Sequence, residues 1–299
     1  MNILIGGSGF ISNYLIKEFI DNGFSVTLIY NKTKPGLSHK NLSLLKANLA
    51  DREQVLKINN KLKKRFNLSI LCAATGPEKS RSIDKMYNNN INTNKNFLEI
   101  LSIKSKKIIY LSSMAIYGTI STNSVSENTK KKSISPYGKS KLDGENIMRK
   151  LCKIYKNKYF ICLRLPGVVG VGVKYIFLSN VLNSILNNKK FFIRNSLQKF
   201  NNVIYVKDLS KYILSINKSS NFSIGKNVIL NLASKHPIEI RYIIKFMRQF
   251  FNHKKNVISI SEKKSFIINI KKSIDYGFKP RSTIGSIFMY LLDYEKINY

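Results

Sequence analysis

Strand-like apolar runs alternate with segments of helical periodicity along the first half of this chain, and this alternation constrains the fold more than any other feature of the sequence. The expected strands are residues 2–5, 24–30, 43–46, 68–73, 107–112 and 159–163. The expected helices are residues 10–22, 52–66, 83–103 and 136–155. Such alternation favours parallel strands with helices on both faces, so we predict an α/β fold with a doubly wound, Rossmann-like parallel sheet.

The alternation becomes irregular beyond residue 165, where a helical segment at 176–187 is followed by short strand-like and helical pieces. We therefore expect a dinucleotide-binding domain over residues 1–165 and a smaller C-terminal substrate-binding lobe over most of residues 166–299. A later strand within about 203–232 is expected to contribute to the first domain. The length of 299 residues and the hydrophobic content of 43% give such a fold ample core.

Cysteine spacing, histidine spacing and apolar runs indicate the broad class of protein. The cysteines and histidines are Cys72, Cys152, Cys162, His39, His236 and His253. The absence of CxxC spacing predicts reduced thiols, and the scatter of the histidines predicts no metal site. No run of about 18 apolar residues is present, which excludes a conventional transmembrane helix. An apolar strand begins almost at Met1 and leaves no room for a signal peptide, so we expect a cytoplasmic protein.

The net charge of +35 raises the question of a nucleic-acid or anionic-membrane partner. The basic residues, however, are about 42 lysines and only about 9 arginines, and asparagine and isoleucine are enriched together with lysine. Because arginine is preferred for bidentate phosphate and base contacts, compositional drift explains the charge better than dedicated binding does. We expect only weak, non-specific binding to polyanions, confined to low salt.

A glycine-rich segment, Gly6–Ser12 (GGSGFIS), lies between the first expected strand and the first expected helix. Glycines at this point permit a tight turn and a close approach of the backbone to a pyrophosphate, which the helix N-terminus also attracts. Ser12 replaces the third glycine of the usual fingerprint and is still small enough for helix–strand packing. The segment therefore predicts a dinucleotide site.

A tyrosine and a lysine four residues apart, Tyr137 and Lys141, open the helix that follows Pro136. This spacing puts both side chains on one face of the helix. A lysine ammonium and a cationic nicotinamide ring would both favour the phenolate and lower the tyrosine pKa, as a general acid/base requires. Ser112 and Ser113 end the preceding strand, and ligands of open α/β sheets bind at the carboxyl ends of strands. A serine hydroxyl there can hydrogen-bond the substrate oxygen that the tyrosine protonates.

Together these motifs resemble those of the extended short-chain dehydrogenase/reductase superfamily, of the NAD(P)-dependent sugar epimerase/dehydratase type. The resemblance covers nearly the whole chain and includes ANLAD at 47–51, CAATG at 72–76, NINTNKNFLE at 90–99, SSMAIYG at 112–118, YGKSK at 137–141, RLPGVVG at 164–170 and VIYVKDLSKYI at 203–213. It implies that Ser113, Tyr137 and Lys141 are catalytic. The cofactor-binding residues that it implies are Gly6, Gly9, Phe10, Ile11, Asn48, Leu49, Ala73, Ala74, Asn90, Tyr137, Lys141 and Pro166.

Departures from the family pattern narrow the expected activity. Gly167 stands where the family has an asparagine, and Asn201 stands where it has an arginine that grips the diphosphate of a nucleotide sugar. Both positions, with Ser113, are still expected at the substrate. The basic residues that could replace the missing arginine are Arg194, Lys199 and Lys207. Met114 follows Ser113 in place of the acidic dehydratase signature, which argues against a 4,6-dehydratase.

The end of the second expected strand bears on the choice of cofactor. An acidic residue there usually binds the NAD ribose, whereas a nearby base accommodates the NADP phosphate. Asn31 and Lys32 follow Tyr30 in this chain, and no carboxylate is close in sequence. NADP(H) is therefore favoured, and NAD(H) is the alternative because Asn31 could bind the ribose hydroxyls.

The sequence thus predicts an NAD(P)-dependent epimerase of a sugar or nucleotide sugar, acting by hydride transfer with a Ser-Tyr-Lys site. A keto-sugar reductase with the same three residues is the alternative. From other classes, a non-catalytic cofactor-sensing protein or a nucleic-acid-binding protein on the same fold stays open. The expected partner is a small molecule, and a homodimer is compatible with the sequence.

Overall fold

The computed structural model describes residues 1–80, 82–189, 191–252, 257–260 and 266–298, and the chain forms two compact units. The first unit consists of residues 1–119, 130–164 and 210–230. The second consists of residues 120–129, 165–209 and 231–299. The chain therefore passes between the units several times, and the assignment of one unit to cofactor and the other to substrate stays a prediction.

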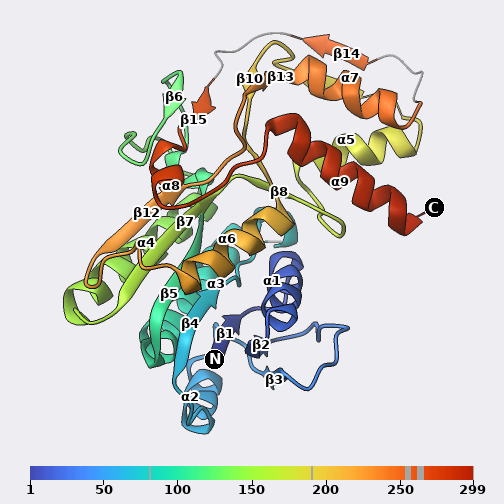
Figure 1. Cartoon of the computed structure of the whole chain (residues 1–299). Helices are drawn as coiled ribbons and strands as arrows, with labels where there is room; N and C mark the ends of the chain where they lie inside the picture. The colour runs from blue at the N-terminus through green and yellow to red at the C-terminus, as the bar shows by residue number, and fades with distance from the viewer. Residues whose placement is uncertain (81, 190, 253–256, 261–265, 299) are drawn as a thin grey trace. The chain divides into compact units, whose positions relative to one another are not determined.

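A seven-stranded sheet forms the centre of the first unit, in the order β12-β7-β5-β4-β1-β2-β3 (Figure 1). The strands are β1 (Asn2–Gly6), β2 (Ser25–Tyr30), β3 (Leu42–Lys46), β4 (Phe66–Leu71), β5 (Ser105–Ser113), β7 (Tyr159–Leu165) and β12 (Asn227–Asn231). Neighbouring strands from β3 across to β5 pair in parallel. The strand order reverses between β1 and β4, because the chain builds outward to β3 and then returns to the other side of β1. The predicted doubly wound parallel sheet is confirmed.

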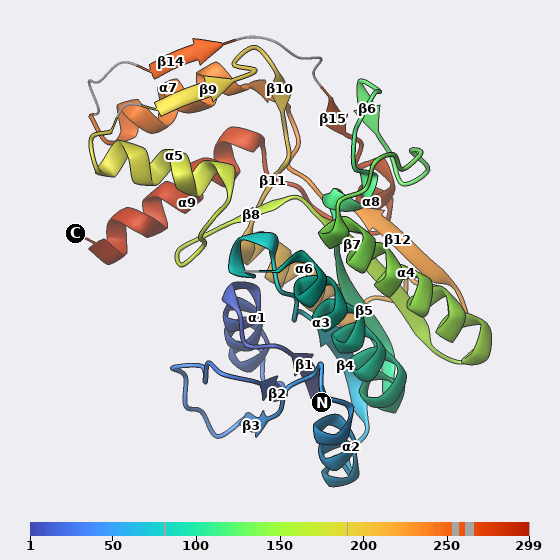
Figure 2. The same cartoon turned by 180° about the vertical axis from the view of Figure 1, so that it is seen from behind.

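Helices cover both faces of this sheet. They are α1 (Phe10–Asp21), α2 (Arg52–Lys61), α3 (Ile83–Lys95), α4 (Pro136–Ile154) and α6 (Val206–Lys218). One buried core joins the sheet to α2, to the turn after α3 and to α4, through side chains such as Val55, Phe97 and Met148. Figure 2 shows α3 and α4 side by side on this face, and Figure 1 shows α6 on the opposite one.

The second predicted helix is shorter than expected. α2 ends at Lys61, and Phe66, which the sequence pattern assigned to the helix, is buried as the first residue of β4. The Lys104 ammonium donates to the carbonyls of Asn59 and Leu62 at 2.6 and 2.7 Å. These bonds satisfy carbonyl groups that have no partner at the end of a helix. Lys104, which is distant in sequence, therefore stabilises the end of α2.

The third predicted helix, over residues 83–103, ends as α3 at Lys95. The chain continues in a π-helical turn at Asn96–Leu101 and a 3₁₀ turn at Ser102–Lys104. In the π-helical turn the Asn96 amide donates to the Leu49 carbonyl at 2.9 Å. Phe97 lies against the end of β1, where a Cβ on Gly6 would come within 2.5 Å of its ring. The glycine at position 6 is thus required by packing between β1 and this turn.

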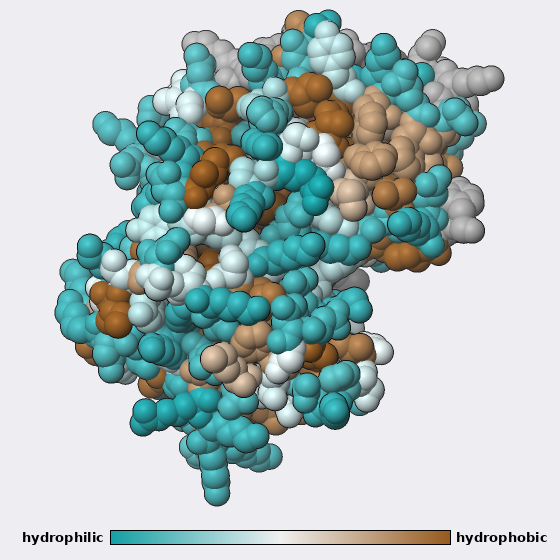
Figure 3. Space-filling view, viewed as in Figure 1, coloured by the Kyte–Doolittle hydropathy of each residue, from teal (hydrophilic) through white to brown (hydrophobic). Residues whose placement is uncertain are grey.

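The second unit contains four two-stranded sheets and four helices among the described residues. The strand pairs are β8 (Gly167–Val169) with β11 (Val203–Tyr205), β10 (Lys199–Phe200) with β13 (Ile238–Glu239), β14 (Val257–Ile260) with β9 (Phe191–Arg194), and β15 (Ile267–Ile268) with β6 (Ser124–Val125). The helices are α5 (Phe177–Leu186), α7 (Ile240–Phe250), α8 (Lys271–Asp275) and α9 (Thr283–Asn298). Residues of α5, α7 and α9 share a second core. Hydrophobic side chains also gather at the surface over α7 and α9, where Phe288 is 41% exposed (Figure 3).

No helix within the described part of the chain is both long and apolar enough to cross a membrane.

Candidate active site

A cavity of about 510 Å³ lies at the carboxyl ends of β1, β2 and β4, where the strand order reverses. This is the position at which doubly wound sheets bind their ligands. The sequence-predicted residues that line it are Gly9, Asn31, Lys32, Asn48, Leu49, Ala73, Ala74 and Asn90. The lining residues that sequence reasoning missed are Gly7, Ser8, Ile29, Thr33, Ala47, Ala50, Cys72, Thr75, Lys85, Asn89 and Thr93. Seven of these, Gly7, Ser8, Ala47, Ala50, Cys72, Thr75 and Thr93, lie within the segments 6–12, 47–51, 72–76 and 90–99 that the sequence singled out, although they were not expected individually.

The glycine-rich loop leaves room for a ligand in front of its backbone. Gly7 has a φ of +102°, and a Cβ there would come within 2.7 Å of Ala73, so only glycine fits. A Cβ on Gly9 would meet nothing closer than the Ser12 hydroxyl at 4.0 Å, which leaves open space at the start of α1. Such space lets a pyrophosphate approach the backbone. The loop therefore fits a dinucleotide.

Ser12 takes a specific role at the start of α1. Its hydroxyl accepts a hydrogen bond from the Gly9 N–H at 2.7 Å and lies 3.1 Å from the Gly9 carbonyl, to which it donates. The side chain is completely buried. Ser12, which replaces the third glycine, thus stabilises the first turn of α1 by two hydrogen bonds with the Gly9 backbone. Phe10 and Ile11 lie in the same turn, half-buried, and do not line the cavity, so their role toward a cofactor stays a prediction.

The charge of the cavity comes from lysines. Lys32 follows β2 and Lys85 comes from α3, and the described lining contains no aspartate or glutamate. The Ser8 hydroxyl donates to the Thr33 carbonyl at 2.5 Å and so ties the glycine-rich loop to the loop after β2. Lys85 was missed, because Asn90 was the one residue of α3 expected at the cofactor and no motif in the sequence includes the first turn of this helix.

Asn90 connects the cavity to α4. Its side chain accepts from the Thr75 N–H at 2.8 Å, and its amide donates to the Thr75 carbonyl at 3.0 Å and to the Ser140 hydroxyl at 3.2 Å. The Ser140 hydroxyl in turn donates to the Tyr137 carbonyl at 2.8 Å. The loop after β4 and the first turn of α4 are therefore held in one network.

The start of α4 is built for close contact with the end of β5. Ser135 caps the helix by accepting from the Gly138 N–H at 3.1 Å, and Pro136 occupies the first turn, as is usual for this residue. A Cβ on Gly138 would lie 2.3 Å from the Ala115 carbonyl. Glycine at this position therefore lets the Tyr137 turn approach the 3₁₀ turn at Met114–Tyr117.

The structure brings Ser113, Tyr137 and Lys141 together. Ser113 ends β5, and its hydroxyl accepts from the Ala115 N–H at 3.1 Å and lies near enough to Tyr137 to act on the pKa of its phenol. Lys141 is 5% exposed, and its ammonium donates to the carbonyl of Leu111 at 2.8 Å. The same nitrogen lies 5.2 Å from the ring centre of Tyr110 and 6.0 Å from that of Tyr137.

Burial is the largest cause of the pKa shifts of both Tyr137 and Lys141. Burial, and after it the negative charge of Glu78, raise the pKa of Tyr137 to about 12, although the Ser113 hydroxyl acts to lower it. Burial lowers the pKa of Lys141 to about 8. The expected lowering of the tyrosine pKa by Lys141 is not found in the chain alone, because burial of the phenol is the largest effect on its pKa.

The remaining predicted positions lie in the second unit. Pro166 is buried just before β8, which Gly167 opens. Asn201 is 3% exposed, and its amide donates to the carbonyls of Ser234 and Ile268 while its oxygen accepts from the Ile268 N–H. These backbone bonds occupy its amide group, and a role at the substrate stays a prediction for Pro166, Gly167 and Asn201 alike.

A diphosphate contact by Arg194, Lys199 or Lys207 stays a prediction. The Lys207 ammonium forms an ion pair with Asp293 at 2.8 Å. The side chain of Arg194 and all of His253 lie outside the described part of the structure. Within that part, no group of three histidine, cysteine or acidic side chains could hold a metal ion.

Comparison with known proteins gives one family. The family model described as "NAD dependent epimerase/dehydratase family" matches residues 3–233. A putative UDP-glucose 4-epimerase of Methanocaldococcus jannaschii is 25% identical over 299 aligned residues, which cover 94% of this chain and 93% of that protein. UDP-glucose 4-epimerase of Thermotoga maritima, solved with UDP-glucose, superposes with a TM-score of 0.84 at 18% identity over the whole of both chains. The Thermus thermophilus UDP-glucose 4-epimerase, solved with NAD, gives 0.80 at 17% identity over 99% of each chain.

Proposed function

The chain belongs to the NAD dependent epimerase/dehydratase family, and from this premise we propose that it is a nucleotide-sugar 4-epimerase with Ser113, Tyr137 and Lys141 as its catalytic residues. The observation that carries the proposal is the meeting of these three side chains at the carboxyl end of β5, in the unit that holds the cavity at the strand reversal. The similarity to UDP-glucose 4-epimerases over nearly the full chain supports the substrate class.

Each residue has a role that follows from its surroundings. Tyr137 holds the proton that the sugar hydroxyl gives up and regains, since its phenol is a titratable hydroxyl on which the Ser113 side chain acts directly. Ser113 orients the same sugar oxygen. Lys141 has one acceptor among the residues that the structure describes, so its other donors are available to ribose hydroxyls and its charge to a phenolate.

The chemistry supplied by the bound nicotinamide cofactor is hydride acceptance and return, and proton transfer is left to the chain. The pKa of about 12 keeps Tyr137 protonated at neutral pH in the chain alone. A cationic nicotinamide ring nearby would favour the phenolate and bring the tyrosine toward its working range. A bound cofactor would thus lower the pKa of Tyr137 and make its phenolate available as the base.

The cavity supports NADP(H) over NAD(H). Two lysines, Lys32 and Lys85, line it together with Asn31, and the described lining lacks the carboxylate that usually binds the ribose of NAD. A 2′-phosphate would find cationic partners there. Titration of both cofactors by calorimetry tests this point, and tighter binding of NADH than of NADPH would reverse it.

A keto-sugar reductase is the second candidate, and the same lysines favour it. An NADPH-preferring site suits a cofactor that is released and replaced at each turnover, whereas an epimerase regenerates its cofactor within the catalytic cycle. Ser113 and Tyr137 serve either reaction.

Stoichiometry separates these two candidates. Purified protein is incubated with UDP-glucose and a catalytic amount of oxidised cofactor, and sugar product and reduced-nicotinamide absorbance are both followed. Many turnovers without net change of the cofactor support an epimerase. A second incubation, with a nucleotide 4-keto-sugar and a stoichiometric amount of reduced cofactor, tests the reductase, and one cofactor oxidised per keto-sugar reduced supports it. Absence of both reactions over a panel of nucleotide sugars overturns the proposal.

A further inference from the structure

A third residue of α4 continues the line of Tyr137 and Lys141. Glu145 follows Lys141 by four residues, so the three side chains lie along one face of the helix. The first two contact the end of β5 as described above. Glu145 adds a contact of its own, because the Ser112 hydroxyl donates to its Oε1 at 2.6 Å. Three successive residues at the end of β5 are therefore each held by this face of α4.

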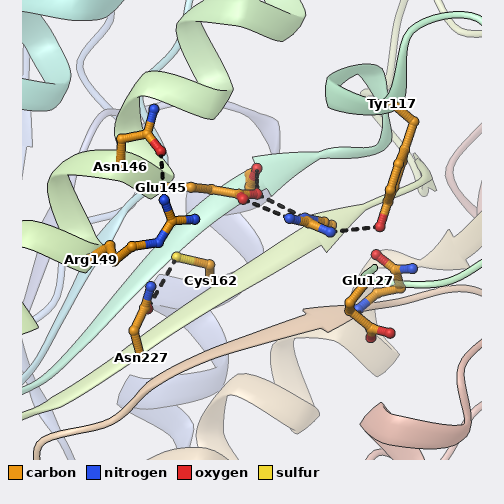
Figure 4. Close-up of polar contacts among 10 residues, drawn as sticks. Tyr117, Glu127, Glu145, Asn146, Arg149, Cys162 and Asn227 are labelled. Atoms are coloured by element: carbon orange, nitrogen blue, oxygen red, sulfur yellow. Dashed lines mark hydrogen bonds and ion pairs between the residues drawn. The ribbon is translucent and has the colours of Figure 1, made fainter. Parts of the chain in front are cut away.

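A buried arginine completes the arrangement. Arg164 of β7 donates from Nε to Oε1 of Glu145 at 2.9 Å and from a terminal nitrogen to Oε2 at 2.8 Å, a bidentate pair (Figure 4). The two side chains are 2% and 0% exposed. The other terminal nitrogen of Arg164 donates to the Tyr117 hydroxyl at 2.7 Å. The pair thus holds Ser112 on one side and Tyr117 on the other.

Those two contacts enclose the short segment that carries Ser113. Ser112 immediately precedes Ser113, and Tyr117 ends the 3₁₀ turn that Ser113 caps. Both ends of the segment are fixed to one buried ion pair on α4 and β7. A shift of this pair would move Ser113 relative to Tyr137, which stands on the same face of α4 as Glu145.

Stability alone does not account for such a pair. Taking two charges out of water has a large free-energy cost, and apolar residues of equal volume often stabilise a core as well or better. A bidentate, fully hydrogen-bonded pair instead fixes geometry. We propose that Glu145 and Arg164 are positioning residues that set Ser113 against Tyr137, an inference that rests on the proposed function for its catalytic consequence.

The test compares substitutions at two buried charged sites of the first unit, the Glu145–Arg164 pair and Lys107. The double variant Glu145→Gln/Arg164→Met removes both charges together, so that neither is left unpaired in the core. Lys107→Met is the matched control, because Lys107 is also buried on β5 and donates to three carbonyls, but at the opposite end of the strand. We expect kcat of the double variant to fall by about 10²-fold with KM changed less than about threefold, since a displacement of about 1 Å costs this much.

A second readout needs no activity. Protein labelled with ¹³Cζ-tyrosine gives one phenol signal per tyrosine, and Tyr137→Phe identifies that of Tyr137. The proposal predicts that the Tyr137 signal moves in the double variant, although neither changed residue touches it, and stays in place in Lys107→Met. If the wild-type protein converts no nucleotide sugar, the proposed function fails, and this signal still decides the positioning role. An unmoved Tyr137 signal, or a kcat that follows that of Lys107→Met, would overturn the inference.

Discussion

Buried lysines hold both ends of β5, and the two ends use them differently. At the amino end, the Lys107 ammonium donates to three carbonyls that close α6, at 2.8, 3.0 and 2.8 Å. At the carboxyl end, the Lys141 ammonium donates to one carbonyl, that of Leu111, and otherwise lies near the rings of Tyr110 and Tyr137. An ammonium has three donors, so Lys107 is saturated by the protein and Lys141 is not.

From this difference we propose that Lys107 serves the structure and that Lys141 serves the chemistry. Lys107 satisfies the carbonyl groups at the end of a helix, where a cation also complements the helix dipole. The Lys141 ammonium has N–H donors without a described protein acceptor, and it lies at the edge of the sheet where ligands of such folds bind. Burial lowers the pKa of both, to about 8 for Lys141, so burial alone would not have separated them. The number of carbonyl acceptors around each ammonium separates the two lysines.

Substitution of Tyr137 gives the largest expected effect at the carboxyl end. We expect Tyr137→Phe to lower kcat by about 10²- to 10⁴-fold, the usual contribution of a general acid/base, with cofactor affinity nearly unchanged. Turnover of the purified variant and cofactor titration measure the two quantities. Turnover close to that of wild type would remove Tyr137 from the mechanism.

The two lysines then make a matched pair. We expect Lys107→Met to lower the free energy of unfolding by about 1–3 kcal/mol, because buried carbonyls lose their donor, and to leave kcat of the folded protein unchanged. Lys141→Met should do the reverse: it abolishes most turnover and costs little stability, since it also removes a buried charge. Urea unfolding and turnover check both variants. Equal losses of kcat in the two would contradict the comparison.

The pH dependence of stability sharpens the same contrast. Lys141 has a pKa of about 8 when folded and an ordinary value of 10.5, so the folded protein binds fewer protons between those limits. Stability therefore rises with pH from about 8 to about 10.5, by on the order of 1–3 kcal/mol, and the cost of the buried charge is fully present below pH 8. The rise should vanish in Lys141→Met when unfolding of the two proteins is compared at each pH. A rise of equal size in that variant would assign it to other groups.

The smallest expected effect concerns the cofactor cavity. We expect Lys32→Ala to weaken NADPH binding about 5- to 10-fold, as an exposed charge–phosphate contact is worth about 1 kcal/mol, and to leave NADH binding unchanged. Lys34→Ala is the matched control, because Lys34 is exposed two residues away and is absent from the described lining. Equal effects of the two substitutions would show a general charge effect.

The fold and much of the site could be predicted from the sequence because the signals are local. Strand–helix alternation, a glycine-rich turn, and a tyrosine and lysine one helical turn apart are each read within a few residues. The cavity position of Lys85, the Glu145–Arg164 pair and the end of α2 at Lys61, which Lys104 stabilises, could not be predicted in this way. Each depends on contacts between elements that are distant in the sequence. The raised pKa of Tyr137 was missed for the same reason, since burial is a property of the packed unit.

The central claim is that the carboxyl end of β5 with α4 forms the site of a nucleotide-sugar 4-epimerase, and an isotope measurement tests it most directly. UDP-glucose carrying deuterium at C4 is incubated with the protein and catalytic cofactor in ordinary water, and the product is examined by NMR. We predict UDP-galactose that retains deuterium at C4 with wild type and with Lys107→Met, and almost none with Tyr137→Phe. Product carrying solvent hydrogen at C4, or product formed equally well by Tyr137→Phe, would contradict the account.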